Sequence, residues 1–459
     1  MSLGLSNSTT DGTLSKPEIE ANFKDLHPLL SQMQAQAESS RCLYCYDAPC
    51  IKACPTGINI PTFIHQIATD NVTGSAKTIL SENIMGGTCA RACPTEVLCE
   101  QDCVLNESLQ QPVKIGQLQR YAVDHLLGRD VPHPFSRKPS SGKTIAVVGA
   151  GPAGLSCAHR AAMLGHEVTI YEAKSKAGGL NEYGLAAYKM ADNFAQKEIE
   201  FLLDIGGISI QYNCGLNQQV MLSDLRQQYD AVFIAIGLSK VNQLNIEGED
   251  SAQVLDAIDL IEDIRQADDL SQISCAENVV VIGAGNTAID AAIQSKRLGA
   301  KNVTLVYRRD EAAMSATRWE VDLARLNQVK MIFCATPVAY HAETQRLSLA
   351  KTQIKDGKVE LTSEHFEMDA DRVLKAIGQK LDSQKLDSQQ LDSQKQQQNF
   401  DLKHQKIAVK RNYMTSLQGV FAGGDCIDGD DLTVEAVQDG KVSGAGDRSL
   451  SNGTGVKHG

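Results

Sequence analysis

Eight of the 13 cysteines fall between residues 42 and 103, in two groups of four. The first group has the spacing C-x2-C-x4-C-x3-C, and the second has the spacing C-x3-C-x5-C-x3-C. Iron–sulfur clusters need thiolates that approach a cuboidal core from several directions, so a close run of cysteines plus a distant ligand is typical. The spacing therefore predicts iron–sulfur clusters held by these cysteines: Cys42, Cys45, Cys50 and Cys54, then Cys89, Cys93, Cys99 and Cys103.

Zinc and disulfides are the alternatives for so many thiols. Zinc sites usually use paired C-x2-C spacings, which the second group lacks. Residues 1–16 show neither a basic start nor an apolar run, so we expect no signal peptide and a cytoplasmic protein. Disulfides are rare in that reducing compartment, which favours metal over cystine.

A glycine-rich turn, Gly149-Ala150-Gly151-Pro152-Ala153-Gly154, follows an apolar run and opens a helical pattern. In such a turn the first glycine allows the sharp bend, the second lets a pyrophosphate approach the backbone, and the third lets helix and strand pack closely. Glu172 ends the next apolar run, where an acid binds ribose hydroxyls. These features predict a dinucleotide-binding unit.

The same pattern returns in the second turn, Gly283-Ala284-Gly285-Asn286-Thr287-Ala288. Its following strand ends in Arg308 and Arg309 and has no terminal acid. Two arginines can pair with a 2′-phosphate, so this unit favours NADP(H), with NAD(H) as the other possibility. The alternative is that the arginines only cap the end of the strand.

A chain with two such units usually holds a flavin in the first and a pyridine nucleotide in the second. Late in the chain, Gly424 and Asp425 follow another apolar run, and in flavoproteins of this kind that segment closes over the flavin ribitol. We therefore expect an α/β protein in which a helical iron–sulfur domain precedes two Rossmann-like domains, the second inserted in the first.

The expected segments follow from these motifs and from changes in composition. Three near-identical LDSQ pentads and a glutamine run mark a low-complexity insert. The expected bounds are an N-terminal extension 1–40, a helical domain with two clusters 41–128, an FAD-binding domain in two parts 143–245 and 399–445, an NAD(P)H-binding domain 246–380, the insert 381–398 and a flexible tail 446–459.

Composition excludes several other classes of protein. The chain has 459 residues, 42 % of them apolar, and a formal net charge of −12. An acidic chain is a poor binder of nucleic acid, because phosphate contacts need clustered lysine and arginine. No apolar run reaches the length of a membrane span. We expect neither a nucleic-acid nor a membrane partner.

Taken in order, six motifs resemble the electron-input half of dihydropyrimidine dehydrogenase, which in bacteria is a separate flavoprotein subunit. The motifs are RCLYCYDAPCIKACP, CARACPTEVLCEQDC, IGQLQRYAVD, VVGAGPAGL, GAGNTAID and FAGGD. The small subunit of glutamate synthase is similar and is the alternative assignment. The run DAPC and Gln119, where glutamate synthase tends to carry an acid, favour the pyrimidine branch.

The resemblance implies how the ligands divide between two [4Fe–4S] clusters. One cluster would take Cys42, Cys45, Cys50 and Cys103, and the other would take Cys54, Cys93, Cys99 and the amide of Gln119. Cys89 would then be spare, although counting cysteines alone would make it a ligand, and we leave the eighth ligand open between Cys89 and Gln119. The implied flavin contacts are Glu172, Gly179, Leu180, Lys189 and Asp425.

The resemblance also implies the activity. NAD(P)H would reduce FAD, and electrons would pass through the clusters to an FMN-containing partner subunit that reduces uracil or thymine. Hydride transfer needs no acid, base or nucleophile from the chain, and we expect no catalytic residue. Segment 184–191 departs from the family pattern G-I-P-x-x-R-L-P, because it lacks both prolines.

Overall fold

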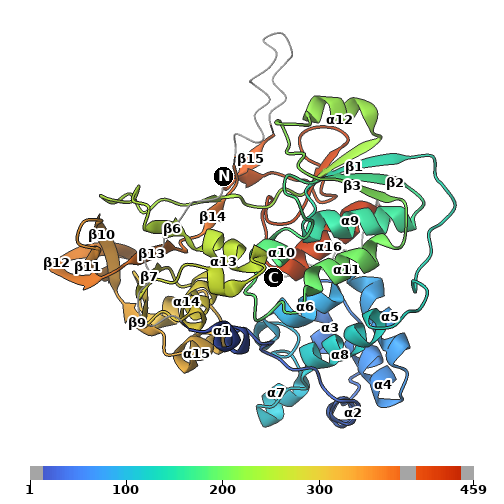
Figure 1. The fold of residues 1–459 in the computed structure, drawn as a ribbon. Helices are drawn as coiled ribbons and strands as arrows, with labels where there is room; N and C mark the ends of the chain where they lie inside the picture. The colour runs from blue at the N-terminus through green and yellow to red at the C-terminus, as the bar shows by residue number, and fades with distance from the viewer. Residues whose placement is uncertain (1–13, 383–399, 446–459) are drawn as a thin grey trace. The chain divides into compact units, whose positions relative to one another are not determined.

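The computed structural model describes residues 14–382 and 400–445 (Figure 1). Nearly all of the expected insert at 381–398 and all of the expected tail at 446–459 lie outside the described residues. The chain divides into two compact units. We call them the large unit (His27–Glu182, Asn193–Lys240 and Lys380–Gly459) and the small unit (Met1–Leu26, Tyr183–Asp192 and Val241–Gln379).

The large unit begins with short helices that carry the cysteines. Side-chain caps start several of them, since Asn59 and Asn71 accept hydrogen bonds from the backbone amides of Thr62 and Gly74. Their inward faces are apolar, and Phe63 is fully buried. The helices are α2 (Gln32–Ser39), α3 (Pro49–Lys52), α4 (Ile60–Ala68), α5 (Val72–Glu82), α6 (Gly86–Ala92), η1 (Thr95–Val97), α7 (Val104–Leu109) and α8 (Ile115–Leu127).

A parallel five-stranded sheet forms the rest of the large unit, with strand order β17-β4-β1-β2-β3. Three of the five residues of its central strand are buried, as expected for a parallel strand covered on both faces. The strands are β1 (Thr144–Val148), β2 (Glu167–Tyr171), β3 (Ile208–Gln211), β4 (Ala231–Ile234) and β17 (Val420–Ala422). The helices are α9 (Pro152–Met163), α10 (Leu180–Tyr183), α11 (Phe194–Leu203), α12 (Leu222–Gln228) and α16 (Thr433–Ala445).

One apolar core joins the cysteine-bearing helices to this sheet. Ile79 and Leu118 of the helical part belong to the same buried cluster as Leu155 of α9 and Ile170 of β2. The large unit also contains an antiparallel hairpin formed by β15 (Leu402–Lys403) and β16 (Lys406–Ile407). The helical part and the sheet of the large unit therefore form one packed body.

Helices α9 and α16 pack very closely in the large unit (Figure 1). A Cβ atom on Gly440 would lie 2.1 Å from the carbonyl oxygen of Ala153, and one on Gly444 would lie 2.5 Å from that of Cys157. The glycines are therefore required where the two helix backbones approach.

The small unit has its own parallel sheet, with strand order β6-β13-β7-β8-β9. A three-stranded antiparallel sheet, β10-β11-β12, is formed by the segment between strands β9 and β13. The strands are β6 (Val254–Asp256), β7 (Asn278–Ile282), β8 (Asn302–Tyr307), β9 (Lys330–Phe333), β10 (Ala335–His341), β11 (Arg346–Lys355), β12 (Lys358–Asp369) and β13 (Arg372–Lys375). The helices are α1 (Lys16–Asn22), α13 (Ala257–Gln266), η2 (Leu270–Gln272), α14 (Asn286–Leu298), η3 (Glu311–Ala313) and α15 (Arg318–Leu326).

The chain leaves the large unit after Lys240 and returns to it at Lys380, where β5 (Lys240–Val241) pairs with β14 (Gln379–Lys380). Leu381 is buried in the large unit, and Asp382 forms an ion pair of 2.8 Å with Lys240. The first two residues of the expected insert are thus part of the folded protein. The predicted fold class is confirmed: helices come first, then two parallel-sheet domains, one inserted in the other. Among the described helices, none is long and apolar enough to cross a membrane.

Candidate functional site

The cysteines separate into two pockets in the large unit, which we call the first and second pockets. Cys42, Cys45, Cys50 and Cys103 line the first pocket, together with apolar side chains such as Ile64. Burial, and then the charges of Cys103, Cys42 and Cys45, raise the pKa of Cys50 to about 12. The four thiols that the resemblance groups together therefore lie around one pocket.

The second pocket is lined by Cys54, Cys93, Cys99 and Gln119, and also by Cys89. The pKa of Cys93 is raised by a hydrogen bond to Cys89 and by burial, and the pKa of Cys99 is raised by burial first and by the nearby charge of Glu100 second. Both candidates for the eighth ligand thus reach the same pocket, so the choice between Cys89 and Gln119 stays open.

Gln119 is held in a defined orientation. Its side chain is buried on α8, and its Nε2 donates a 2.7 Å hydrogen bond to the carbonyl oxygen of Gly86. Because Nε2 makes this hydrogen bond, Oε1 is the remaining polar atom of the Gln119 amide. An amide oxygen can act as a neutral metal ligand. The Gln119 side chain therefore suits the role that the resemblance implies.

The donor chemistry of the two pockets fits iron–sulfur clusters. Soft thiolates select iron–sulfur clusters, copper(I) or zinc, and metal binding deprotonates thiols that would otherwise stay protonated at such raised pKa values. Among the residues that the structure describes, no three His, Cys, Asp or Glu side chains are placed to hold a single metal ion. The cysteines are spread around the walls of the two pockets and do not converge on a single point.

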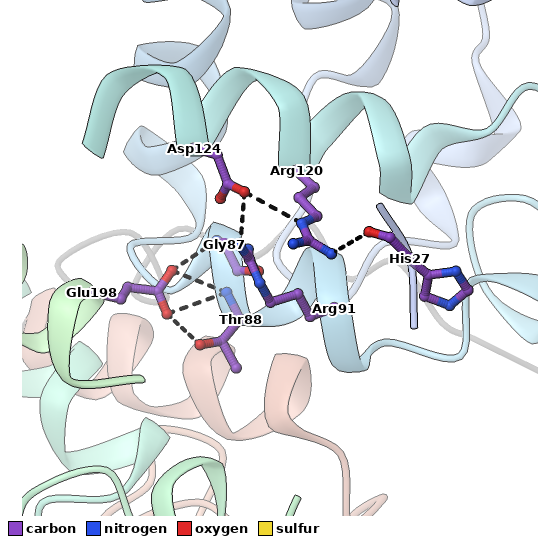
Figure 2. A network of polar contacts seen from close by, with 7 residues as sticks. All are labelled: His27, Gly87, Thr88, Arg91, Arg120, Asp124 and Glu198. Atoms are coloured by element: carbon purple, nitrogen blue, oxygen red, sulfur yellow. Dashed lines mark hydrogen bonds and ion pairs between the residues drawn. The ribbon is translucent and has the colours of Figure 1, made fainter. Parts of the chain in front are cut away.

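A buried carboxylate holds the first turn of α6, the helix that carries Cys89 (Figure 2). Glu198 of α11 accepts hydrogen bonds from the backbone amides of Gly87 at 2.7 Å and Thr88 at 3.1 Å, and also from the Thr88 hydroxyl. Burial raises the pKa of Glu198 to about 7, although these donors act to lower it. Glu198 thus fixes the start of the helix that lines the second pocket.

The first glycine turn also lies in the large unit, at the carboxyl end of β1. Gly149 has φ +102°, and a Cβ there would lie 2.3 Å from the carbonyl oxygen of Ala235. A Cβ on Gly154 would lie 1.9 Å from the carbonyl oxygen of Gly149. Helix α9 begins at Pro152, so its N-terminal amides face the turn in the way that suits a pyrophosphate.

Glu172 follows β2 and contacts the same turn. Its Oε2 accepts a 2.7 Å hydrogen bond from the Ala150 amide, and its Oε1 accepts one of 2.8 Å from the Lys174 amide. The carboxylate is therefore fixed beside the glycine turn, where an acid would meet the ribose of a bound dinucleotide.

The other expected flavin contacts in the large unit surround this turn. A Cβ on Gly179 would lie 2.8 Å from the Cα of Gly151, and one on Gly424 would lie 2.9 Å from the Cβ of Ala153. Leu180 begins α10 directly after Gly179. Asp425 follows Gly424, and burial, with the nearby charge of Asp431 second, raises its pKa to about 6. These segments meet at the carboxyl end of the sheet.

Lys189 belongs to the small unit, although the resemblance names it as a flavin contact. It is buried, with Nζ 2.8 Å from Asp290 Oδ1 and 2.5 Å from Glu320 Oε1. The Tyr188 hydroxyl also donates to Asp290, at 2.9 Å. In this structure two carboxylates of the small unit hold the Lys189 ammonium.

The second glycine turn lies in the small unit between β7 and α14. Gly283 has φ +141°, and a Cβ there would lie 2.1 Å from the carbonyl oxygen of Ala376. The segment before α15 packs on this turn, since the Ala316 amide donates to Ala284 at 2.9 Å and the Thr317 amide to the Asn286 side chain at 3.4 Å. Thr287 follows Asn286 in the first turn of α14.

Arg308 and Arg309 follow β8, and both side chains are exposed. Their backbones are fixed, because the carbonyl of Arg308 accepts from the Thr352 hydroxyl at 2.8 Å and that of Arg309 from the Cys334 amide at 3.0 Å. The backbone is therefore fixed at both arginines, while their side chains are exposed and accessible to a ligand phosphate.

Comparison with known proteins agrees with this arrangement. Residues 143–440 match the pyridine nucleotide-disulphide oxidoreductase family, and residues 19–131 match the 4Fe-4S cluster domain described as dihydropyrimidine dehydrogenase domain II. The NADPH complex of FprA from Mycobacterium tuberculosis shares the fold, with a TM-score of 0.52 and 19% identity over 67% of this chain and 84% of that chain. Fold and pockets together define a pyridine-nucleotide-dependent flavoprotein oxidoreductase with an iron–sulfur domain.

Two relatives narrow the assignment. The PreT subunit of NAD-dependent dihydropyrimidine dehydrogenase from Salmonella typhimurium is 33% identical over 92% of this chain and 96% of its own length. The NADPH glutamate synthase small chain of Escherichia coli is 30% identical over 92% of this chain and 93% of its own. The chain belongs to the family of dihydropyrimidine dehydrogenase PreT subunits, to which the glutamate synthase small chain is related.

Sequence reasoning missed the polar residues that support the second pocket. Glu198 is more than a hundred residues from its partners Gly87 and Thr88, so no local pattern pairs them. Asp124 and Arg120 are separated by one helical turn and form a pair that helical spacing could have indicated.

Proposed function

We propose that this protein is the electron-input subunit of a dihydropyrimidine dehydrogenase. NAD(P)H binds the small unit, FAD binds the first glycine turn, and two [4Fe–4S] clusters occupy the two pockets. The observation that carries the proposal is the joint presence of the flavin-type turn and both cysteine pockets in one packed body, the large unit. We place the protein in the cytoplasm, since reduced thiols persist there.

The chain itself supplies binding and orientation. The FAD would be held by Gly149, Ala150, Gly151, Ala153 and Gly154 at the pyrophosphate, with Glu172 at the ribose and Gly179, Leu180, Gly424 and Asp425 around the remainder. When bound, FAD and the clusters supply the step from two-electron to one-electron transfer, and the protein sets position and potential. The assignment of Lys189 to the flavin stays a prediction, which its carboxylate partners in the small unit do not support.

The partner in this proposal is an FMN-containing subunit that reduces uracil or thymine. The name of the 33% identical relatives supports this choice. A glutamate synthase small subunit is the second candidate, supported by the 30% identical relative. In both cases the chain delivers electrons to another protein.

One experiment separates the two functions. The chain is expressed in its native host with an affinity tag, and the copurified complex is assayed with NADPH and with NADH. We expect oxidation with uracil or thymine as acceptor and no glutamate formation from 2-oxoglutarate plus glutamine. Glutamate formation without uracil reduction would assign the second function instead.

The nucleotide preference is a further part of the proposal. Relatives with NAD in their name and a relative with NADPH in its name are similarly close to this chain. We propose a preference for NADPH, because Arg308 and Arg309 place two exposed cations after β8, where a 2′-phosphate would lie.

A further inference from the structure

The turn that carries Asp425 is bound by a side chain of the last helix. The Gly424 amide, in the middle of the turn, donates a 2.8 Å hydrogen bond to Oδ2 of Asp439, which belongs to α16. Gly424 has φ +75°, in the left-handed region that glycine adopts without steric cost. Asp439 therefore fixes the backbone of this turn directly before Asp425.

A tyrosine joins the same carboxylate to the strand that leads into the turn. The Tyr413 hydroxyl donates a hydrogen bond to the Asp439 carboxylate. The Tyr413 carbonyl oxygen accepts a 3.0 Å hydrogen bond from the amide of Ala422, the last residue of β17. The contacts of Tyr413 and Asp439 thus close a ring around the segment from Ala422 to Gly424, and we call these two side chains the clamp.

The backbone of Tyr413 has an unusual conformation. Its φ is +62°, in the left-handed region that a bulky residue other than glycine rarely adopts. Its amide donates to the carbonyl oxygen of Lys410 at 2.9 Å, and its own carbonyl is bound by Ala422. Such conformations persist where the surrounding structure determines them, and they cluster at functional sites. The contacts of Tyr413 therefore set its position against its own backbone preference.

The clamped turn lies against the first glycine turn of the large unit. A Cβ on Gly424 would lie 2.9 Å from the Cβ of Ala153, which is in the first turn of α9. Gly440 directly follows Asp439, and a Cβ on Gly440 would lie 2.1 Å from the carbonyl oxygen of Ala153. Two neighbouring residues of α16 therefore fix both segments that are expected to contact FAD.

Asp425 is accessible to a ligand in this arrangement. Within residues 14–382 and 400–445, no other residue donates a hydrogen bond to the Asp425 carboxylate. Because Asp425 directly follows Gly424, the backbone of the turn sets the position of this carboxylate. The clamp acts on Asp425 through that backbone.

We propose that Tyr413 and Asp439 are positioning residues for FAD, which hold the turn so that Asp425 meets the cofactor; this inference rests on the proposed function. Neither side chain needs to touch FAD. Loss of the Asp439 carboxylate would leave the Gly424 amide without its acceptor, and an amide left without a partner favours other conformations of the turn. The need to order the turn again would then oppose FAD binding.

The test measures the dissociation constant of FAD for the full-length protein after removal of the flavin, from the fluorescence of added FAD. Asp439→Ala should raise this constant by about tenfold or more, since the Gly424 amide loses its acceptor. Asp439→Asn keeps an acceptor oxygen and should stay close to the wild type, and Tyr413→Phe should have a smaller effect than Asp439→Ala. The matched control is Asp430→Ala, which removes an exposed acid from the segment between the turn and α16 and should change nothing.

A positioning role is separated from general damage by combining these variants with Asp425→Ala. If the clamp acts through Asp425, Asp439→Ala should weaken FAD binding far less in the Asp425→Ala background than in the wild type. If Asp439→Ala does not fold, Tyr413→Phe serves in the same double-mutant cycle.

Three results would overturn the inference: an unchanged constant in Asp439→Ala, equal weakening by Asp439→Ala and Asp439→Asn, or equal weakening in both backgrounds. Wild-type protein that binds no FAD would overturn the proposed function instead.

Discussion

Replacing Gly440 with alanine should weaken the large unit, although alanine is the better helix former. In an open helix this change stabilises by about 0.5–1 kcal/mol. In α16, however, the new Cβ would lie 2.1 Å from the carbonyl oxygen of Ala153 and 2.9 Å from the Cys157 amide nitrogen, where ordinary contact begins at 3.4 Å. Both atoms are backbone, so no side chain can rotate away.

The cost follows from this clash. Overpacking a well-packed contact costs about 1–3 kcal/mol, occasionally more, and this clash with backbone belongs at the upper end. After the helix-propensity gain, we expect a net loss of about 1–2 kcal/mol in the free energy of unfolding. Ala153 is in the first turn of α9, which faces the glycine turn, so FAD should also bind less tightly. Each 1.4 kcal/mol of binding free energy that is lost raises the dissociation constant of FAD roughly tenfold.

The assay is thermal unfolding of the purified protein together with FAD retention after gel filtration. Ser443→Ala is the matched control, since Ser443 lies on the same helix and its buried hydroxyl has no hydrogen-bond partner among the described residues. We expect a lower unfolding temperature and less retained FAD for Gly440→Ala, and neither for Ser443→Ala. A Gly440→Ala protein that unfolds at a higher temperature with full FAD would refute the packing argument.

Three further predictions concern nucleotide choice, pH and the cluster ligands. Arg308→Ala should weaken NADPH binding by about 10–100-fold, since a charge-assisted phosphate contact is worth roughly 1.5–3 kcal/mol, and equal weakening of NADH in fluorescence titrations would contradict this. The pKa of Glu198 is about 7, above the usual 4.5, so its contribution to stability is full below pH 4.5 and is lost as pH rises through 7. Denaturant unfolding should show that Glu198→Gln loses less free energy of unfolding between pH 5 and pH 8 than the wild type does, by on the order of 3 kcal/mol. Parallel pH curves for the two proteins would argue against this. Cys89→Ser should keep all of its iron while Gln119→Ala alters one cluster's spectrum, and loss of half the iron in Cys89→Ser alone would make the cysteine the ligand.

The sequence predicted the glycine turns and the two-part fold because these depend on local chemistry. A turn such as that at Gly149 needs glycine within a few residues of a strand and a helix, and that pattern is visible without any long-range information. The grouping of Cys103 with Cys42 is different, because spacing alone does not join cysteines across sixty residues. It came from the family resemblance, and the first pocket is consistent with it.

The supporting network was not predictable from sequence for a physical reason. The contact of Glu198 with Thr88 depends on how α11 packs on α6, which only the folded core determines. Composition also did not indicate that Leu381, which belongs to the first LDSQ pentad, is buried in the folded unit. A repeat marks a low-complexity segment, but it does not show which of its residues pack against the folded core.

In the proposed function, this chain would take electrons from NAD(P)H and hold them in one flavin and two iron–sulfur clusters. The direct measurement is anaerobic purification, quantification of FAD, iron and zinc per chain, and electron paramagnetic resonance before and after addition of NAD(P)H. We predict one FAD, about eight irons for two four-iron clusters, and cluster signals that appear once the nucleotide is added. Zinc in place of iron, or clusters that dithionite reduces while NADPH and NADH leave the flavin oxidised, would contradict the account.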